Sequence, residues 1–254
     1  WGAYLNAAED NSDGTITVTT SGAEDGETVT ITGNGDFPTD TCSVSSNTCT
    51  ATIAGADLRA LADGTTYTIT VNVDDTAGNA ATADTGDTFV YDKTAPTSSA
   101  ASEATSGSGN ANNGDVVTIT LDPSEAIGTP TCTFTDGDGA MEDTSVTYGT
   151  VSSTDHATAA VTVADGDDDG AVGFSCTYSD LAGNALAAAI TAVTDGSAVT
   201  IDNTHPTSSA VTIAVTGSGD ANNADVVTIT LDPSETVGTP TCTWTDGSGA
   251  MADT

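Results

Sequence analysis

The sequence predicts an all-β protein built from immunoglobulin-like β-sandwich domains in a linear tandem array. Three observations carry this prediction. Residues 110–144 return 110 residues later as residues 220–254, with 28 of 35 positions identical, and a fixed period of about one small domain indicates tandem repeats. Short runs alternate polar and apolar residues with period two, as half-buried strands do. Aromatic residues are only 4% of the chain, so its cores must be built from Val, Ile, Ala and the methyl group of Thr, a composition that favours strands.

The first predicted domain covers residues 1–93. The run TITVT at residues 15–19 is typical of its strands, because threonine alternates there with isoleucine or valine. The sequence ADLRALA at residues 56–62 predicts a single helical turn, and DDTAGN at residues 74–79 predicts a turn between strands. The strands are expected at residues 15–19, 28–32, 48–53 and 67–73, followed by a last strand that ends at Tyr91.

The second predicted domain covers residues 94–203, and the third covers residues 204–254. The turn DLAGN at residues 180–184 is the counterpart of the turn at residues 74–79. The third domain carries too few strands to bury a core, so we expect either that the chain continues naturally or that another chain supplies the missing strands. The strands of the second domain are expected at residues 116–121, 131–135, 157–163, 172–178 and 199–202.

The charge of the chain restricts its partners. Only 2 residues are Lys or Arg against 37 Asp or Glu, which gives a formal net charge of −35. Such a chain is repelled by nucleic acid and by anionic lipid headgroups, so its natural partners are cations, a salty medium or basic surfaces. The sequence also lacks an apolar run of about 18 residues, so we do not expect it to insert into a membrane.

The five cysteines need an oxidising compartment if they pair. Cys42 and Cys49 are placed to face each other across a hairpin, and Cys132 and Cys176 to join two strands of the second domain. Cys242 is left over, because the repeat places its partner 110 residues after Cys176, beyond residue 254. We therefore expect Cys242 to be unpaired or to pair between molecules.

Several motifs of the first domain resemble the immunoglobulin-like repeats of large bacterial surface adhesins. They are LNAAE at residues 5–9, SGAEDGETVTI at 21–31, ALADGTTYTITV at 60–71, DDTAGN at 74–79 and YDKTAPT at 91–97. In the other two domains, PSEAIGTPT, YSDLAGNA and TDGSAVTIDNTHPT resemble a sister group of such repeats in long extracellular proteins of microbes. The resemblance covers essentially the whole chain. It implies a non-enzymatic structural module that serves as a spacer, stalk, filament wall or surface-layer part.

The resemblance also implies calcium, because relatives of these repeats often hold Ca²⁺ where domains meet. Asp92 and Asp202 each follow a last strand and stand four residues before a proline, which stiffens the crossing into the next domain. The sequence leaves open the alternative that such carboxylates only cap turns and that the acidity is an adaptation to salt. The ligands expected from the resemblance are Asp92 and Asp202 in the linkers, Asp74, Asp75 and Asp180 in the AGN turns, and Glu125 and Glu235 in the PSE loops.

Two other acidic loops, at residues 136–143 and 165–170, have the composition of calcium loops without the spacing. An EF-hand closes its twelve-residue loop with a bidentate Glu, and Thr147 stands at that position of the first loop. The copy of this loop in the third domain also lacks two of its acids. We expect both loops to be solvated turns.

Catalysis is not expected. The chain has two histidines, His156 and His205, and the preceding repeat has Ala95 in the place of His205, so a general base there is poorly supported. Asp122 and Glu125 resemble the carboxylate pair of a glycosidase, but the pair recurs beside a proline in the next repeat, which suits a structural turn.

The sequence leaves three functions in play. In the first, the chain is part of a rigid extracellular stalk or filament, held by Ca²⁺ at its joints and by disulfides, and its partners are further repeats. In the second, it is a subunit of an assembled filament or surface-layer lattice, and a neighbouring copy of the chain supplies a strand to the third domain. In the third, it is a carbohydrate- or ice-binding adhesin module, for which a flat row of threonines is the mark and surface glycans are partners. All three place the chain outside the cell, at its surface.

Overall fold

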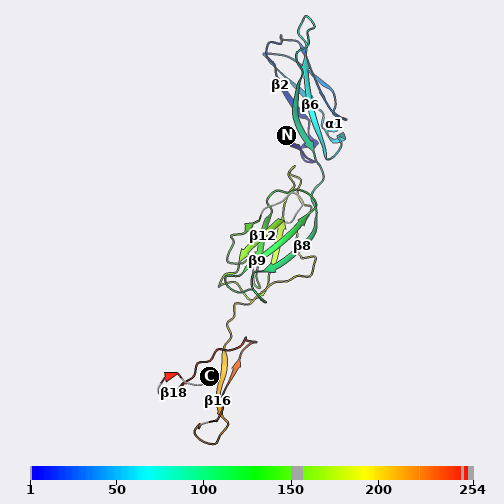
Figure 1. Cartoon of the computed structure of the whole chain (residues 1–254). Helices are drawn as coiled ribbons and strands as arrows, with labels where there is room; N and C mark the ends of the chain where they lie inside the picture. The colour runs from blue at the N-terminus through cyan, green and yellow to red at the C-terminus, as the bar shows by residue number, and fades with distance from the viewer. Residues whose placement is uncertain (1, 150–156, 223, 247–248, 251–254) are drawn as a thin grey trace. The chain divides into compact units, whose positions relative to one another are not determined.

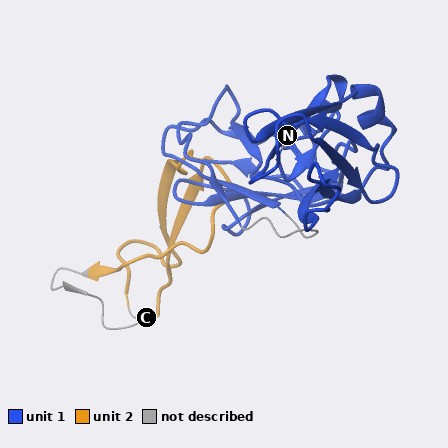
Figure 2. Ribbon diagram, turned by 90° about the horizontal axis from the view of Figure 1, so that it is seen from above, with its two compact units in different colours: residues 1–202 blue, residues 203–254 orange. Residues whose placement is uncertain are grey.

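The computed structural model is nearly all β, and it contains two compact units, Trp1–Asp202 and Asn203–Thr254. Figure 2 colours the two units, which are taken separately below. None of the helices in the described residues has the length and apolar character that a membrane span requires. The structure describes residues 2–149, 157–222, 224–246 and 249–250.

The first sandwich, residues 4–91, consists of a five-stranded sheet and a two-stranded sheet that face each other. The smaller sheet pairs β2 (Gly14–Thr19) with β5 (Thr48–Ile53), and β2 lies near β6 in Figure 1. The larger sheet has the order β1-β7-β6-β3-β4. Its strands are β1 (Tyr4–Leu5), β7 (Asp84–Tyr91), β6 (Thr65–Val73), β3 (Thr28–Gly33) and β4 (Asp40–Ser43).

The core of the first sandwich follows the period-two pattern of its strands. On β5, Cys49, Ala51 and Ile53 are buried while the threonines between them are exposed. Tyr67 of β6 stacks on Phe89 of β7 with ring centroids 5.4 Å apart, and Phe37 and Tyr91 are buried in the same core. The prediction of a core built only from aliphatic side chains and threonine methyl groups is therefore wrong for this sandwich. The expected helical turn is present as α1 (Gly55–Ala60), and a short 3-10 helix, η1 (Glu9–Asn11), lies against it.

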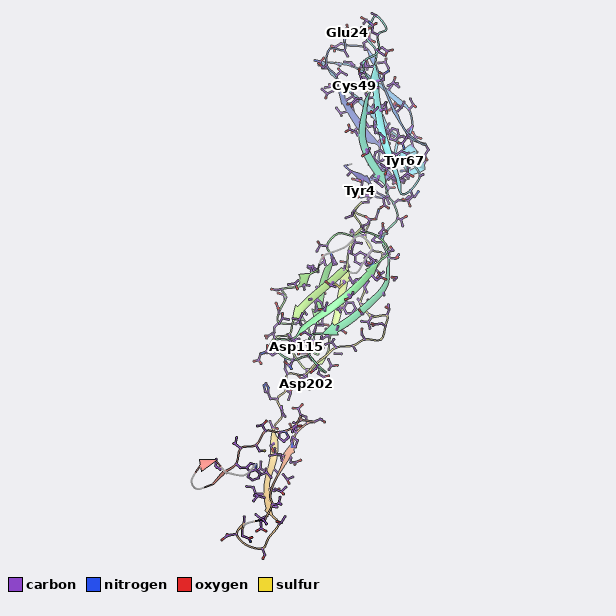
Figure 3. The ribbon with its side chains drawn as sticks, in the orientation of Figure 1. Tyr4, Glu24, Cys49, Tyr67, Asp115 and Asp202 are labelled. Atoms are coloured by element: carbon purple, nitrogen blue, oxygen red, sulfur yellow. A yellow bond between two sulfur atoms is a disulfide. The ribbon has the colours of Figure 1, made fainter. Side chains whose placement is uncertain are left out.

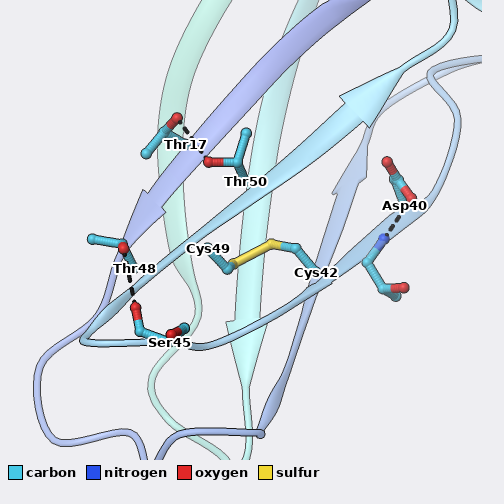
Figure 4. Close-up of a disulfide and its surroundings, with 8 residues drawn as sticks. Thr17, Asp40, Cys42, Ser45, Thr48, Cys49 and Thr50 are labelled. Atoms are coloured by element: carbon cyan, nitrogen blue, oxygen red, sulfur yellow. Dashed lines mark hydrogen bonds between the residues drawn. A yellow bond between two sulfur atoms is a disulfide. The ribbon is translucent and has the colours of Figure 1, made fainter.

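The disulfide between Cys42 and Cys49 connects the two sheets of the first sandwich. Cys42 lies on β4 of the larger sheet and Cys49 on β5 of the smaller one, and Figure 4 shows the bond between them. The chain reverses between the two strands at Ser46 and Asn47, whose φ angles of 53° and 62° are left-handed. Such a reversal matches the twist of the flanking strands.

The second sandwich, residues 98–201, has a four-stranded sheet of order β11-β12-β9-β8. Opposite it lies the pair β10–β14, and β13 pairs separately with β15. Val117, Ile119 and Leu121 of β9 are fully buried in its core, together with the aromatic side chains of Phe134, Phe174 and Tyr178. The strands are β8 (Ser98–Thr105), β9 (Val116–Pro123), β10 (Thr131–Thr135), β11 (Thr147–Tyr148), β12 (Ala157–Thr162), β13 (Gly170–Ala171), β14 (Gly173–Thr177) and β15 (Thr200–Ile201).

The disulfide between Cys132 and Cys176 lies within one sheet of the second sandwich. The two residues stand directly opposite each other on β10 and β14, with Cα atoms 4.1 Å apart. The bond therefore joins neighbouring strands, as the order of the strands in the sequence predicts, and it does not connect the two sheets.

Strand β8 does not follow from the alternation rule, because its sequence SSAASEAT lacks aliphatic residues larger than alanine. It lies at the edge of the sheet, pairs antiparallel with β9, and buries Ala101 and Glu103. The segment around Thr194 and Ser197 binds the other edge of β8. The Thr194 hydroxyl oxygen accepts from the Ala101 N–H, and the Ser197 hydroxyl oxygen accepts from the Glu103 N–H. Pairing on both edges explains why so polar a run becomes a strand.

The second unit contains the hairpin of β16 (Ser208–Val215) and β17 (Val227–Pro233) and the short pair β18 (Thr245–Asp246) and β19 (Gly249–Ala250). The hairpin copies β8 and β9, and even its register shift between Ser208 and Ala210 recurs 110 residues after that between Ser98 and Ala100. Within this unit, Cys242 is a free, exposed cysteine.

Candidate metal site at the joint of the first two sandwiches

Three carboxylates converge where the first sandwich meets the second. One oxygen from each of Asp92, Glu125 and Asp180 lies within 4.8 Å of the other two. Asp92 directly follows β7, the last strand of the first sandwich, while Glu125 follows β9 and Asp180 follows β14 in the second. The cluster therefore combines the linker with two loops of the next sandwich. Its three residues are among the seven ligands that the resemblance implies, and their role as metal ligands stays a prediction.

Asp180 is held by its own turn. Its two carboxylate oxygens accept from the backbone N–H and from the side-chain amide of Asn184, each over 2.8 Å. The turn closes through Gly183, whose φ of +95° is left-handed and favours glycine. Asp180 is only 5% exposed, so the turn presents a fixed carboxylate rather than a mobile one.

The same turn binds the first sandwich. The Asn184 amide also donates to the main-chain oxygen of Asp92 over 2.8 Å. The Asn184 side-chain oxygen accepts from the Ala7 N–H, and the Asn6 amide donates to the Ala182 oxygen over 2.7 Å. Direct hydrogen bonds thus join the turn of the second sandwich to Asn6, Ala7 and Asp92 beside the first. These bonds position Asp92 beside Asp180.

The electrostatics of the cluster disfavour the ionised forms of Asp92 and Glu125. Burial raises the pKa of Asp92, and the negative charges of Asp180 and Asp63 raise it further. Burial also raises the pKa of Glu125, with added contributions from the charges of Asp92 and Asp180. The charged forms of Asp92 and Glu125 are thus disfavoured, and a divalent cation in the cluster would reverse that effect.

The donors in this cluster suit a hard cation. All three side chains offer oxygen, which Ca²⁺ prefers, and Ca²⁺ completes its six to eight ligands with carbonyl or water oxygens at about 2.3–2.6 Å. Carboxylates from separate loops also tolerate the irregular geometry that Ca²⁺ accepts and Mg²⁺ does not. The residues present therefore fit Ca²⁺.

The second predicted joint contains part of the same arrangement. The Asp202 N–H donates to the Ala111 oxygen over 2.9 Å, as the Asp92 N–H donates to that of Leu5. Figure 3 shows Asp202 at the same end of the second sandwich as Asp115. Glu235 is half-buried in the second unit, and the counterpart of Asp180 would follow residue 254. The roles of Asp202 and Glu235 as ligands stay predictions.

Asp74 and Asp75 lie away from Asp92. They follow the end of β6, whereas Asp92 follows the end of β7, and the two strands are antiparallel, so the two positions are at opposite ends of the sandwich. Asp75 accepts from the side chain and backbone of Asn79, and the Asn79 side chain is the main cause of its lowered pKa. The turn at Asp75 thus has the internal bonds of the Asp180 turn but is exposed, and its metal-binding role stays a prediction.

The acidic loops of the second sandwich are ordered by their own backbone. Asp136 accepts from the N–H groups of Asp168 and Gly139, and the first of these bonds is the main cause of its lowered pKa. Asp167 accepts from the N–H groups of Glu142 and Ala164. The bonds from Gly139 and Ala164 close turns, whereas those from Asp168 and Glu142 join the two loops to each other. Asp167 is only 3% exposed, so the expectation of solvated turns is wrong for this residue. His156, the other histidine considered above, lies outside the described residues.

Sequence reasoning missed the amide side chains of this joint. Asn184 and Asn6 make the bonds that position the carboxylates, yet neither carries the charge that suggests a ligand. The recurrence of Asn at the end of both AGN turns, as Asn79 and Asn184, was the available signal.

Comparison with protein-family models and with curated proteins finds no match. Among solved structures, the chain is similar to repeat domains of large bacterial adhesins. A Ca²⁺-stabilised adhesin that helps an Antarctic bacterium reach out and bind ice shares 24% identity at a TM-score of 0.40, over 84% of this chain and 48% of that one.

Two further adhesins match in the same way. A 1.5-MDa bacterial ice-binding adhesin shares 23% identity at a TM-score of 0.44, over 84% of this chain and 65% of that one. A tetra-tandem repeat from the extending region of a large adhesion protein shares 20% identity at a TM-score of 0.34, over 80% of this chain and 48% of that one. This chain thus spans between 48% and 65% of the lengths of the three structures. At these identities and TM-scores, the similarity assigns neither a ligand nor a partner to this chain.

Proposed function

We propose that this chain is a non-enzymatic structural module of an extracellular adhesin-type protein, in which immunoglobulin-like sandwiches follow one another as a rigid stalk or filament. The observation that carries the proposal is the convergence of Asp92, Glu125 and Asp180 at a joint that Asn184 already bridges. A module whose domains are joined by direct side-chain hydrogen bonds is suited to holding length and direction.

Calcium stiffens this joint in the proposed mechanism. When bound, Ca²⁺ supplies positive charge shared by Asp92 from one side and by Glu125 and Asp180 from the other. Asn184 fixes the turn so that Asp180 faces Asp92 before the cation arrives, which lowers the ordering cost of binding. Without the cation, the repulsion among the three carboxylates acts to open the same joint.

An extracellular location agrees with the covalent and electrostatic character of the chain. Two disulfides, Cys42–Cys49 and Cys132–Cys176, are typical of proteins in an oxidising compartment. The formal net charge of −35 favours solubility, and dissolved salt screens the repulsion among the carboxylates of the chain.

The experiment that tests the proposal compares thermal unfolding and small-angle X-ray scattering of the chain with Ca²⁺ and with a chelator. At a free Ca²⁺ concentration of about 100 Kd, binding stabilises the folded form by about 2.7 kcal/mol, so the melting temperature should fall on chelation and the scattering should show a more flexible joint. If neither the melting temperature nor the flexibility responds to the chelator, the proposal is wrong.

A carbohydrate- or ice-binding face is a second candidate, and one observation favours it. The smaller sheet of the first sandwich presents three directly opposed, exposed threonine pairs to solvent. An ice-recrystallisation assay and a glycan array on the intact chain test this face, with Thr17→Lys as the variant that should abolish either activity. The pairs are Thr15–Thr52, Thr17–Thr50 and Thr19–Thr48.

A further inference from the structure

A turn of the first sandwich holds the main chain on both sides of Asp92. Asp63 and Gly64 form this turn, which lies between α1 and β6. The Gly64 N–H donates to the Tyr91 oxygen over 2.7 Å. One oxygen of the Asp63 carboxylate accepts from the Lys93 N–H over 2.8 Å. The residue before Asp92 and the residue after it are therefore both bound to a single turn.

The other oxygen of Asp63 is connected to the Asp92 carboxylate through one residue, Thr94. The Thr94 hydroxyl donates to Asp63, and the Thr94 N–H donates to a carboxylate oxygen of Asp92 over 3.1 Å. The main chain of Asp92 is fixed in addition, because its N–H donates to the Leu5 oxygen over 2.9 Å. Contacts to the first sandwich therefore set the position of the Asp92 carboxylate.

Asp63 makes these bonds as a charged carboxylate. Burial acts to raise its pKa, but the hydrogen bonds from Lys93 and Thr94 outweigh burial and hold the pKa below its ordinary value of 3.8. Hydrogen bonds to an ionised acceptor are shorter and stronger than bonds between neutral groups. After burial and the charges within the cluster, the charge of Asp63 also contributes to the raised pKa values of Asp92 and Glu125. The turn thus acts on the cluster although Asp63 is not one of its members.

We propose that Asp63 is a positioning residue of the joint, which holds the linker and the Thr94 hydroxyl so that the Asp92 carboxylate faces the two carboxylates of the second sandwich. The inference rests on the proposed function, because it assigns Asp63 a role toward the same Ca²⁺ site. Asp63 acts through Asp92 rather than as a ligand, because both of its oxygens accept hydrogen bonds from the linker. Replacing a residue that orients a metal ligand typically weakens metal binding by about 10–100-fold.

Three variants separate this role from a general effect on charge or folding. Asp63→Ala removes both acceptors, and it should leave the cores folded because Asp63 is exposed. Asp63→Asn keeps one oxygen that can accept from the Lys93 N–H, but it lacks the charge and the second acceptor. Asp57→Ala is the matched control, since Asp57 is an exposed carboxylate on α1 of the same sandwich. The charge of Asp57 is not among those that act on Asp92 or Glu125.

The first readout is NMR in a chelator, which needs no cation. Hydrogen exchange of the Lys93 N–H should be about tenfold faster in Asp63→Ala, because this group loses a bond to a charged acceptor. Asp63→Asn should restore part of that protection. The resonances of the Asn184 side-chain amide should also move in Asp63→Ala, because this amide donates to Asp92 across the joint. Asp57→Ala should leave both signals unchanged.

The second readout is Ca²⁺ titration by calorimetry. Asp63→Ala should bind Ca²⁺ about 10–100-fold more weakly than the unchanged chain, Asp63→Asn should have an intermediate Kd, and Asp57→Ala should have an unchanged one. The proposal is overturned by equal Kd values for Asp63→Ala and the unchanged chain, by unchanged exchange of the Lys93 N–H, or by unmoved Asn184 resonances.

Failure of the unchanged chain to bind Ca²⁺ would contradict the proposed function instead. The Lys93 and Asn184 signals, which are recorded in a chelator, would then still decide whether Asp63 positions Asp92.

Discussion

The side-chain amide of Asn184, in the second sandwich, donates to the main-chain oxygen of Asp92, the linker residue that directly follows the first sandwich, over 2.8 Å. The same amide group donates to the Asp180 carboxylate over 2.8 Å. One side chain therefore holds the linker and a candidate metal ligand in a fixed relation, and the joint is ordered before any cation binds.

Replacing Asn184 by Ala should open this joint without unfolding either core. Lys93 in the linker and Arg59 are the only two basic residues of the chain, so trypsin cleavage after Lys93 reports on the linker directly. Loss of about 1 kcal/mol of hydrogen bonding corresponds to roughly fivefold more of the open form and fivefold faster cleavage. Asn79→Ala, in the equivalent exposed turn, is the control and should leave the cleavage rate unchanged.

Glu125→Gln should raise the melting temperature at pH 7 in the absence of divalent cations. Burial, followed by the charges of Asp92 and Asp180, raises the pKa of Glu125 above its ordinary value of 4.5. A carboxyl with a raised pKa stabilises the fold most below pH 4.5, and that contribution is lost as the pH rises through the raised value. Calorimetry in a chelator should therefore find the variant more stable than the unchanged chain at pH 7 and equal to it near pH 3.5; the opposite order at pH 7 would contradict the electrostatic account.

Removing either disulfide should lower the unfolding free energy, and the two losses should differ. Cys132 and Cys176 are 44 residues apart and Cys42 and Cys49 only 7. If the bonds act by restricting the unfolded chain, replacing the first pair by Ala should lower the unfolding free energy by about 4 kcal/mol and replacing the second by about 2.4 kcal/mol. Denaturant unfolding of the two double variants measures both values, and an equal loss would rule out the loop-length explanation.

Glu103→Ile should stabilise the second sandwich at neutral pH. The Glu103 carboxylate is buried on β8, where one oxygen accepts from the Val199 N–H and the other has no hydrogen-bond partner in the structure. Burial raises its pKa, so its ionisation destabilises the fold as the pH rises above 4.5. The next repeat has Ile213 at this position. The gain, about 1–3 kcal/mol from removing an unsatisfied buried group, should shrink when the melt is repeated near pH 3.5.

Most of the strands could be predicted from sequence because their threonines alternate with Val, Ile or Ala, as in β2 and β5. Strand β8 could not, since its Ser, Ala and Glu residues carry little strand preference and it forms only because β9 and the segment at Thr194 pair with its two edges. Such tertiary pairing overrides local propensity.

The joint was predicted only in part, for a similar reason. Motif and repeat identified the positions of Asp92, Glu125 and Asp180, whose carboxylates the structure brings together. They did not identify Asn184, whose role depends on which backbone atoms of the first sandwich come within reach. Motif and repeat also grouped Asp75 with Asp180, because the two turns share the AGN sequence and the same internal hydrogen bonds. The turns differ in the neighbouring residues, which the motif does not include.

Calcium titration of the intact chain by isothermal calorimetry tests the central claim most directly, with Asp180→Asn and Asp75→Asn as a matched pair. Both variants lose the same hydrogen bonds within an AGN turn, but only Asp180 lies in the carboxylate cluster. The account predicts saturable binding by the unchanged chain and by Asp75→Asn, and its loss in Asp180→Asn. No binding by the unchanged chain, or equal loss in both variants, would contradict a calcium site at this joint.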